Sequence, residues 1–165
     1  MSAHPEIQCF KYVNHSYEDV SEALVHDAVG LFERATQQAT NRASTLVTKL
    51  NVSIGGFEVG RNVVVRVLKA NRNAEAPAHI ADRATELEIE WHAEKAAALF
   101  PAMRAKLTIY PLAKDETQLQ LVGEYAPPGG VFGNVADKIV GHRIAEASVH
   151  TFLDALARRM NDELC

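Results

Sequence analysis

Three polar residues near the end of the chain have a spacing at which their side chains could act together. His142, Glu146 and His150 follow one another at four-residue steps, so they share one flank of a helix. A common metal ion is excluded, because histidines eight residues apart lie about 12 Å apart along a helix, whereas zinc ligands lie about 2 Å from the ion. We therefore predict no metal site, and we interpret Glu146 and the neighbouring Arg143 as ordinary surface charges.

His142 is the residue of this group for which we predict contact with a ligand. It lies on the same helical stripe as Val135, Ile139 and Val149, which are expected to face inward. A histidine beside a cavity can bind a polar group of a ligand, or take up and release a proton near neutral pH.

The sequence lacks the motifs of other common kinds of catalysis. There is no G-x-S-x-G nucleophile elbow, and Cys9 has no partner that the sequence identifies. The glycine-rich segment 127–133 fails the G-x-G-x-x-G spacing, so we interpret it as a turn between a strand and a helix. Glu86, Glu88 and Glu90 alternate with apolar residues and are expected to form a solvated face. We therefore predict no catalytic residue and no cofactor.

The composition is that of a globular domain with a core, because 47% of the 165 residues are apolar and 23% are charged. The formal net charge of -4 argues against a dedicated nucleic-acid-binding protein. No segment approaches the roughly 18 unbroken apolar residues that a membrane-spanning helix needs. Residues 1–10 do not read as a secretion signal, and two cysteines are too few for a disulfide framework, so we expect a cytoplasmic protein. Nothing in the sequence decides whether the chain forms a homo-oligomer.

The first part of the chain predicts a strand followed by helical structure. Residues 7–13 read as a short strand, and Ser16 stands three residues before Asp19, which is the spacing of a helix-capping box. Apolar residues then recur at three- and four-residue steps as far as Ala35, which indicates a helical stripe. Gly30 falls inside this stripe, so the region reads either as one helix or as two helices with a break.

The middle of the chain alternates apolar and polar residues, which is typical of antiparallel strands with one buried face. The alternation predicts strands at residues 46–54, 61–69, 86–93, 106–110 and 118–125. The first two strands are expected to form a hairpin, the last two are joined by a turn at 114–117, and residues 70–84 read as a loop.

One long helix is predicted over residues 131–162. Its buried stripe consists of Phe132, Val135, Ile139, Val149, Leu153, Leu156 and Met160. Strands followed by a long helix, with a helical region near the start, indicate an α+β fold in which helices gather on the apolar face of a curved antiparallel sheet. We predict a single domain that spans residues 1–165.

Several segments of the second half of the chain match the pattern of a known family. They are LFPAM (99–103), LTIYPL (107–112) and GHRIAEA (141–147), with Thr117, Leu119, Leu121, Gly123, Tyr125, Pro127, Pro128 and Asp137, and a weaker match at GGFEVG (55–60). In these segments the chain resembles bacterial proteins of the SRPBCC superfamily, the START-like or polyketide-cyclase-like group.

The resemblance implies a helix-grip fold of the START/Bet v 1 type. In this fold a curved antiparallel sheet wraps around a long C-terminal helix, with a cavity between them. Members of the superfamily carry lipids, sense hormones, cyclise polyketides or assist chaperones. The matching positions are mostly glycines, prolines and core apolar residues, so the resemblance implies a fold and carries over no catalytic residue.

The residues expected to face this cavity are the candidates for ligand binding. They are Trp91, Ile109, Leu121 and Tyr125 on the sheet, with Ile139, His142 and Val149 on the helix. Each apolar member of the set can instead belong to a filled core, and that alternative stays open. Trp91 and Tyr125 are the better candidates because each carries a polar tip that usually finds a hydrogen-bond partner when it is buried.

Three functions are compatible with these observations. The first is binding of a small apolar or aromatic molecule between the sheet and the C-terminal helix, without chemistry of the protein's own. The second is an enzyme of the cyclase, aromatase or dehydratase kind that uses the same cavity, with His142, Tyr125 or Trp91 beside the substrate. The third is an accessory protein that uses the fold as a scaffold for interactions. We favour the first, although a fold does not determine a function.

Overall fold

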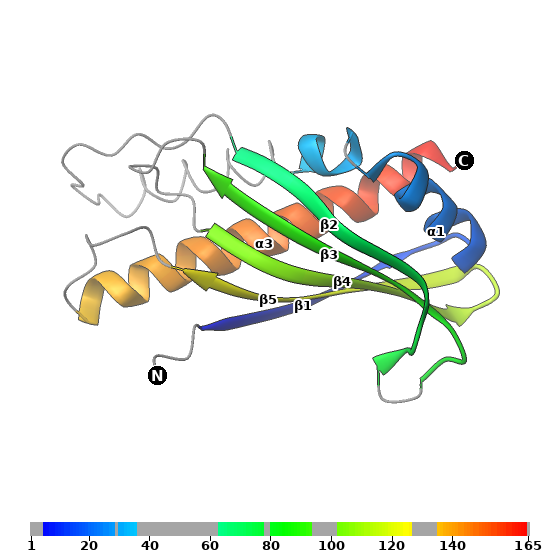
Figure 1. Cartoon of the computed structure of the whole chain (residues 1–165), viewed down its shortest axis with the longest axis horizontal. Coiled ribbons are helices and arrows are strands. Elements are labelled where there is room, and N and C mark those ends of the chain that lie inside the picture. Colours follow the sequence, from blue (N-terminus) through cyan, green and yellow to red (C-terminus); the bar gives the residue numbers. More distant parts are fainter. Residues whose placement is uncertain are drawn as a thin grey trace.

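One antiparallel sheet and a long helix make up most of the described structure (Figure 1). The computed structural model describes residues 5–28, 30–35, 63–77, 80–93, 102–126 and 135–164. Their elements are β1 (Glu6–Val13), α1 (Tyr17–His26), β2 (Val63–Ala74), β3 (Ala84–Ala93), β4 (Ala102–Ala113), β5 (Glu116–Ala126) and α3 (Val135–Glu163). The strands follow the order β1-β5-β4-β3-β2, and the sheet curves across α3. The predicted α+β fold with a curved antiparallel sheet and a C-terminal helix is confirmed.

The start of α1 follows the predicted capping signal. The Ser16 side chain accepts a hydrogen bond from the backbone N–H of Asp19 at 3.2 Å, which satisfies a donor that the first helical turn leaves free. The helix ends at His26, and residues 30–35 are helical again, so two helical segments are observed. A Cβ atom at Gly30 would lie 2.7 Å from an Asp27 carboxylate oxygen, so a larger residue there would require the Asp27 side chain to move.

The two faces of the sheet differ as the alternation predicted. Buried apolar side chains on the inner face come from β3, β4 and β5, among them Leu87, Ile89, Leu107, Ile109, Leu119 and Leu121. On the outer face Glu86 and Lys106 form an ion pair at 3.4 Å, and Glu90 and Arg104 form one at 3.8 Å. The prediction that the three glutamates of β3 lie on a solvated face is therefore confirmed for Glu86 and Glu90.

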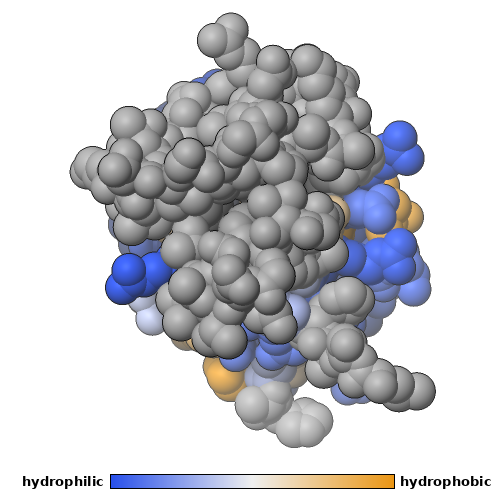
Figure 2. Space-filling model, turned by 90° about the vertical axis from the view of Figure 1, so that its left-hand side faces the viewer, coloured by the Kyte–Doolittle hydropathy of each residue, from blue (hydrophilic) through white to orange (hydrophobic). Residues whose placement is uncertain are grey.

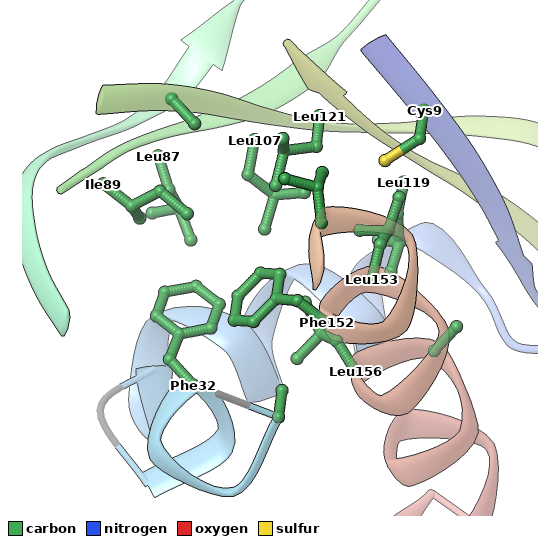
Figure 3. Close-up of a cluster of buried hydrophobic side chains, with 14 of the residues drawn as sticks. Cys9, Phe32, Leu87, Ile89, Leu107, Leu119, Leu121, Phe152, Leu153 and Leu156 are labelled. Carbon is green, nitrogen blue, oxygen red and sulfur yellow. The ribbon is translucent and has the colours of Figure 1, made fainter. Parts of the chain in front are cut away.

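The fully buried core lies where the C-terminal half of α3 packs against the sheet. Val149, Phe152, Leu153, Leu156 and Met160 are fully buried on one face of α3. Figure 3 shows leucines of the sheet pointing toward Phe152 and toward Phe32 of the second helical segment. The two phenylalanine rings lie 5.8 Å apart between centroids, a tilted arrangement that aromatic pairs favour. The predicted stripe is confirmed from Val149 onward.

Two predictions about the sheet were wrong. Residues 70–74 are not loop: β2 continues to Ala74, with register shifts on the way. The alternation does not reveal this part of the strand, because residues 70–73 are all exposed. The outer face is also not solvated throughout, since Tyr110 is buried there with Ala76 and Ala84. Ala76 belongs to the connection between β2 and β3, which covers this end of β4.

Some predictions concern residues outside the described ranges. The strand at 46–54, the turn at 127–133 and Phe132 are among them. Among the helices that the structure describes, none is long and apolar enough to cross a membrane.

Candidate functional site

A hydrogen bond joins the sheet to the N-terminal part of α3. The hydroxyl of Tyr125, near the end of β5, lies 2.6 Å from Nδ1 of His142 on α3. The two rings are tilted to each other at a centroid distance of 5.8 Å. Tyr125 is a buried residue of the inner face, whereas His142 is exposed, so the pair runs from the interior to the surface. The structure thus brings together two of the three candidates with a polar group that the sequence analysis selected.

The electrostatic surroundings keep the Tyr125 phenol protonated. Burial raises the pKa of this phenol above its ordinary value of 10.0, and the Glu146 carboxylate raises the pKa further. A neutral phenol can donate its hydrogen to an unprotonated Nδ1, and Nε2 of His142 then carries the ring hydrogen. The pair can therefore present a donor to a ligand, or pass a proton between the interior and the surface.

Small and adaptable side chains lie beside Tyr125 on the inner face. Gly123 precedes it by two residues on β5 and pairs with Ala105 of β4. A Cβ atom at Gly123 would lie 2.9 Å from the Ala105 Cβ and 2.9 Å from the Met103 sulfur. The Met103 sulfur therefore lies close to Gly123, which has no side chain. Because methionine is unbranched and flexible, it can change conformation more easily than the leucines of the main core.

The strand register places the predicted aromatic positions in one row. Trp91 of β3 pairs with Met103 of β4, and Met103 pairs with Tyr125 of β5. Adjacent strands are about 4.8 Å apart, so positions 91 and 125 lie roughly 10 Å apart across the sheet. The side chain of Trp91 lies outside the described part of the structure, and so does that of Ile139.

The other predicted site residues belong to the packed core. Ile109, Leu121 and Val149 are fully buried among apolar neighbours. Met103 was missing from the prediction, because the strand was expected to begin only at residue 106, whereas β4 begins at Ala102. The signal that would have found Met103 is the continued alternation of Met103, Ala105 and Leu107.

Cys9 does not have the surroundings of a nucleophile. Its thiol is free and buried on β1, and burial raises its pKa from 9.0 to about 12. A thiol with this pKa stays protonated near neutral pH, and the thiolate is the reactive form. Within the described ranges, no three His, Cys, Asp or Glu residues are grouped closely enough to hold a metal ion.

Two hollows on the surface of the described structure have charged residues as half or more of their lining. One of about 470 Å³ lies on the outer face and includes Glu88, Arg104 and Lys106. Another, of about 380 Å³, lies beside the start of α1, where Arg83 forms an ion pair with Glu18 and stacks on the Tyr17 ring. At the end of the molecule where α3 begins, the visible described surface is also mostly hydrophilic (Figure 2). These features differ from the apolar pocket with a few polar groups that is typical of small-molecule sites.

Comparison with known proteins identifies the fold. No family model matches the chain, and no curated protein matches its sequence. The Zhui aromatase/cyclase from Streptomyces sp. R1128 superposes with a TM-score of 0.53 at 12% identity, over 98% of this chain and 96% of that one. TTHA0849 from Thermus thermophilus gives 0.50 at 16% identity, over 98% and 100% of the two chains. A START superfamily protein from Mycobacterium smegmatis gives 0.42 at 14% identity, over 97% and 99%.

This chain has a helix-grip fold. The expected fold of the START/Bet v 1 type is therefore confirmed, and it is the fold of SRPBCC proteins. At identities of this size the likeness shows the architecture alone. In this helix-grip fold, the Tyr125–His142 pair joins the sheet to the helix that it grips.

Proposed function

We propose that this helix-grip protein binds a small apolar or aromatic molecule between the inner face of the sheet and the N-terminal part of α3. The hydrogen bond between Tyr125 and His142 carries the proposal, because it fixes a phenol oxygen that can still accept a hydrogen bond on an otherwise apolar face. Beside it, the Met103 sulfur lies close to Gly123, and this flexible side chain can move aside for a ligand. The apolar inner face of the sheet supplies affinity, and the Tyr125 hydroxyl selects ligands with a polar end.

Binding of two probes tests this proposal. 1-Anilinonaphthalene-8-sulfonate reports an apolar site by its fluorescence, and 2-naphthol adds a hydroxyl that the Tyr125 side chain can bind. We expect both probes to bind saturably, and Tyr125→Phe to weaken 2-naphthol about tenfold, as loss of one hydrogen bond worth about 1.4 kcal/mol would. Native mass spectrometry of freshly purified protein, repeated after denaturation, shows whether a ligand is retained.

Tyr17→Phe is the matched control. The Tyr17 hydroxyl is also buried and bonded, to Thr85 Oγ1 at 2.8 Å, but it lies under α1, away from His142. This variant should leave the affinity for 2-naphthol unchanged. If neither probe binds saturably, or if the two variants weaken 2-naphthol equally, the proposed site is wrong.

The same pair favours a second function, an enzyme of the cyclase or aromatase kind. A phenol hydrogen-bonded to an imidazole, with Glu146 one helical turn further on, can assist removal of a proton from an activated carbon. The likeness to an aromatase/cyclase is in agreement with this alternative. Exchange of the central methylene hydrogens of benzoylacetone for deuterium would measure the activity. We expect His142→Gln to slow protein-dependent exchange about 100-fold, and an unchanged rate would exclude the enzymatic role of His142.

A further inference from the structure

The two edge strands of the described sheet, β1 and β2, are built differently. The pairing of β2 with β3 is interrupted by register shifts after Val67 and after Asn71. Exposed charged residues follow its length at Arg66, Lys69 and Arg72. Bulges and charges are the features by which natural edge strands avoid pairing with another chain. Within the described sheet, β2 therefore carries features that disfavour pairing with a second chain.

The β1 edge has no register shift, and its exposed charge is Glu6 at the start of the strand. Its pairing with β5 runs without interruption from Glu6 to Val13. Its one lysine, Lys11, turns to the inner face and forms an ion pair with Asp154 of α3 at 3.1 Å. The outer face of the strand instead carries Phe10 and Tyr12, which are 45% and 57% exposed. A regular edge with exposed aromatic residues is the kind of strand that pairs with another chain.

The hydrogen bonds to β5 determine which backbone groups face the free edge. The backbone N–H of Tyr125 donates to the carbonyl oxygen of Pro5 at 3.2 Å, so these residues form a hydrogen-bonded pair of the ladder. Such pairs alternate along an antiparallel strand. The residues that direct their N–H and C=O groups away from β5 are therefore Glu6, Gln8, Phe10 and Tyr12. In the described ranges no strand pairs with this side of β1.

We propose that β1 pairs with β1 of a second copy of this chain, antiparallel about a two-fold axis, so that the two sheets become continuous. One register pairs all four edge-facing residues, with Glu6 opposite Tyr12 and Gln8 opposite Phe10 of the other copy. In this register each carboxylate of Glu6 faces a phenol hydroxyl that can donate to it, and no like charges are opposed. The strand is thus complementary to itself, as an isologous interface requires.

The oligomeric state of the full-length chain tests the proposal. Sedimentation velocity from about 2 to 200 μM, under reducing conditions, should show reversible formation of a species of twice the 18.1 kDa chain mass. Phe10→Lys places a charge on the edge, and Gln8→Pro removes an edge-facing N–H that the β1–β5 ladder does not use. Each variant should raise the dimer dissociation constant at least about tenfold.

Leu68→Lys is the matched control, because it adds the same charge at an exposed apolar residue of the opposite edge, 44% exposed, and should leave the dissociation constant unchanged. Circular dichroism establishes that each variant is folded. Amide hydrogen exchange provides an independent measurement: the amides of Gln8, Phe10 and Tyr12 should gain protection as concentration rises. A monomer at every concentration would overturn the proposal. So would a dimer that both β1 variants leave intact, or one that forms without protection of these amides.

Discussion

The two ends of α3 meet the inner face of the sheet in different ways. Toward its C-terminus the helix packs through fully buried side chains such as Phe152 and Leu156, and the Phe152 ring lies 5.8 Å from that of Phe32 in the second helical segment. Toward its N-terminus Ala145 is buried and the exposed His142 is hydrogen-bonded to Tyr125, while the side chains of residues 135–141 lie outside the described part of the structure. Close-packed apolar contacts hold a helix in place, whereas the proposed ligand would lie beside the hydrogen-bonded pair at the other end. The first end therefore stabilises the fold, and we assign binding to the second.

Truncation of Phe152 should give the largest loss of stability. Its ring is fully buried against that of Phe32, so Phe152→Ala removes apolar burial and leaves a cavity. We expect the free energy of unfolding to fall by about 3–5 kcal/mol in urea denaturation. Leu112→Ala, at a residue 39% exposed, is the control and should change the stability by less than about 0.5 kcal/mol. Equal losses would mean that the C-terminal end is not the packed one.

A methyl group at Gly123 tests whether the side chains near Tyr125 can rearrange to accept extra volume. The new Cβ atom would lie 2.9 Å from the Ala105 Cβ and the Met103 sulfur. Met103 can rotate, but Ala105 cannot, so we expect Gly123→Ala to destabilise the fold by about 1–3 kcal/mol. The double variant with Met103→Ala should recover part of this loss in thermal denaturation. Without any recovery, Met103 would not be the adaptable residue of the site.

Removal of the Tyr125 hydroxyl should lower the free energy of unfolding by a smaller amount and should change the pH dependence of that free energy. The pKa of this phenol is raised in the folded state, so the fold binds its proton more tightly than the unfolded chain does. That contribution to stability is present below about pH 10 and is lost as the pH rises through the folded pKa. Tyr125→Phe should therefore lower stability by about 1 kcal/mol at pH 7, and the difference from the parent protein should shrink above pH 10.

Urea midpoints of both proteins from pH 7 to 11.5 measure this effect. The difference between them cancels the contributions of Cys9 and Tyr110, whose pKa values burial also raises. A difference that stays constant with pH would show that the fold does not favour the protonated form of Tyr125.

The ion pair between Lys11 and Asp154 should have the smallest effect. Both side chains are about one-third exposed, at 38% and 33%, so water screens their attraction. Asp154 also keeps a second partner in Arg158 at 2.7 Å. A double-mutant cycle of Lys11→Met and Asp154→Asn should give a coupling of about 0–1 kcal/mol. A larger coupling would mean that charge, and not packing alone, holds β1 against α3.

Local signals in the sequence were sufficient for most elements. The capping pair of Ser16 and Asp19 acts over three residues, and the start of α1 agrees with it. The alternation in β3 and β5 also predicted which faces are buried, because side chains of a strand point alternately to its two sides. The end of β2 was missed, since an exposed edge strand leaves no alternation to read. Whether residues 1–165 form a single domain stays a prediction.

The sequence by itself determined the classes of element, the apolar face of the sheet and the selection of Tyr125 and His142 as polar candidates. Only the tertiary structure decided that these two side chains touch, that Met103 lies over Gly123, and that β1 and β2 are the edges of the described sheet. The physical reason is range. Capping and periodicity act between residues a few positions apart. These contacts instead depend on strand register and on the docking of α3, whose His142 lies 17 residues after Tyr125.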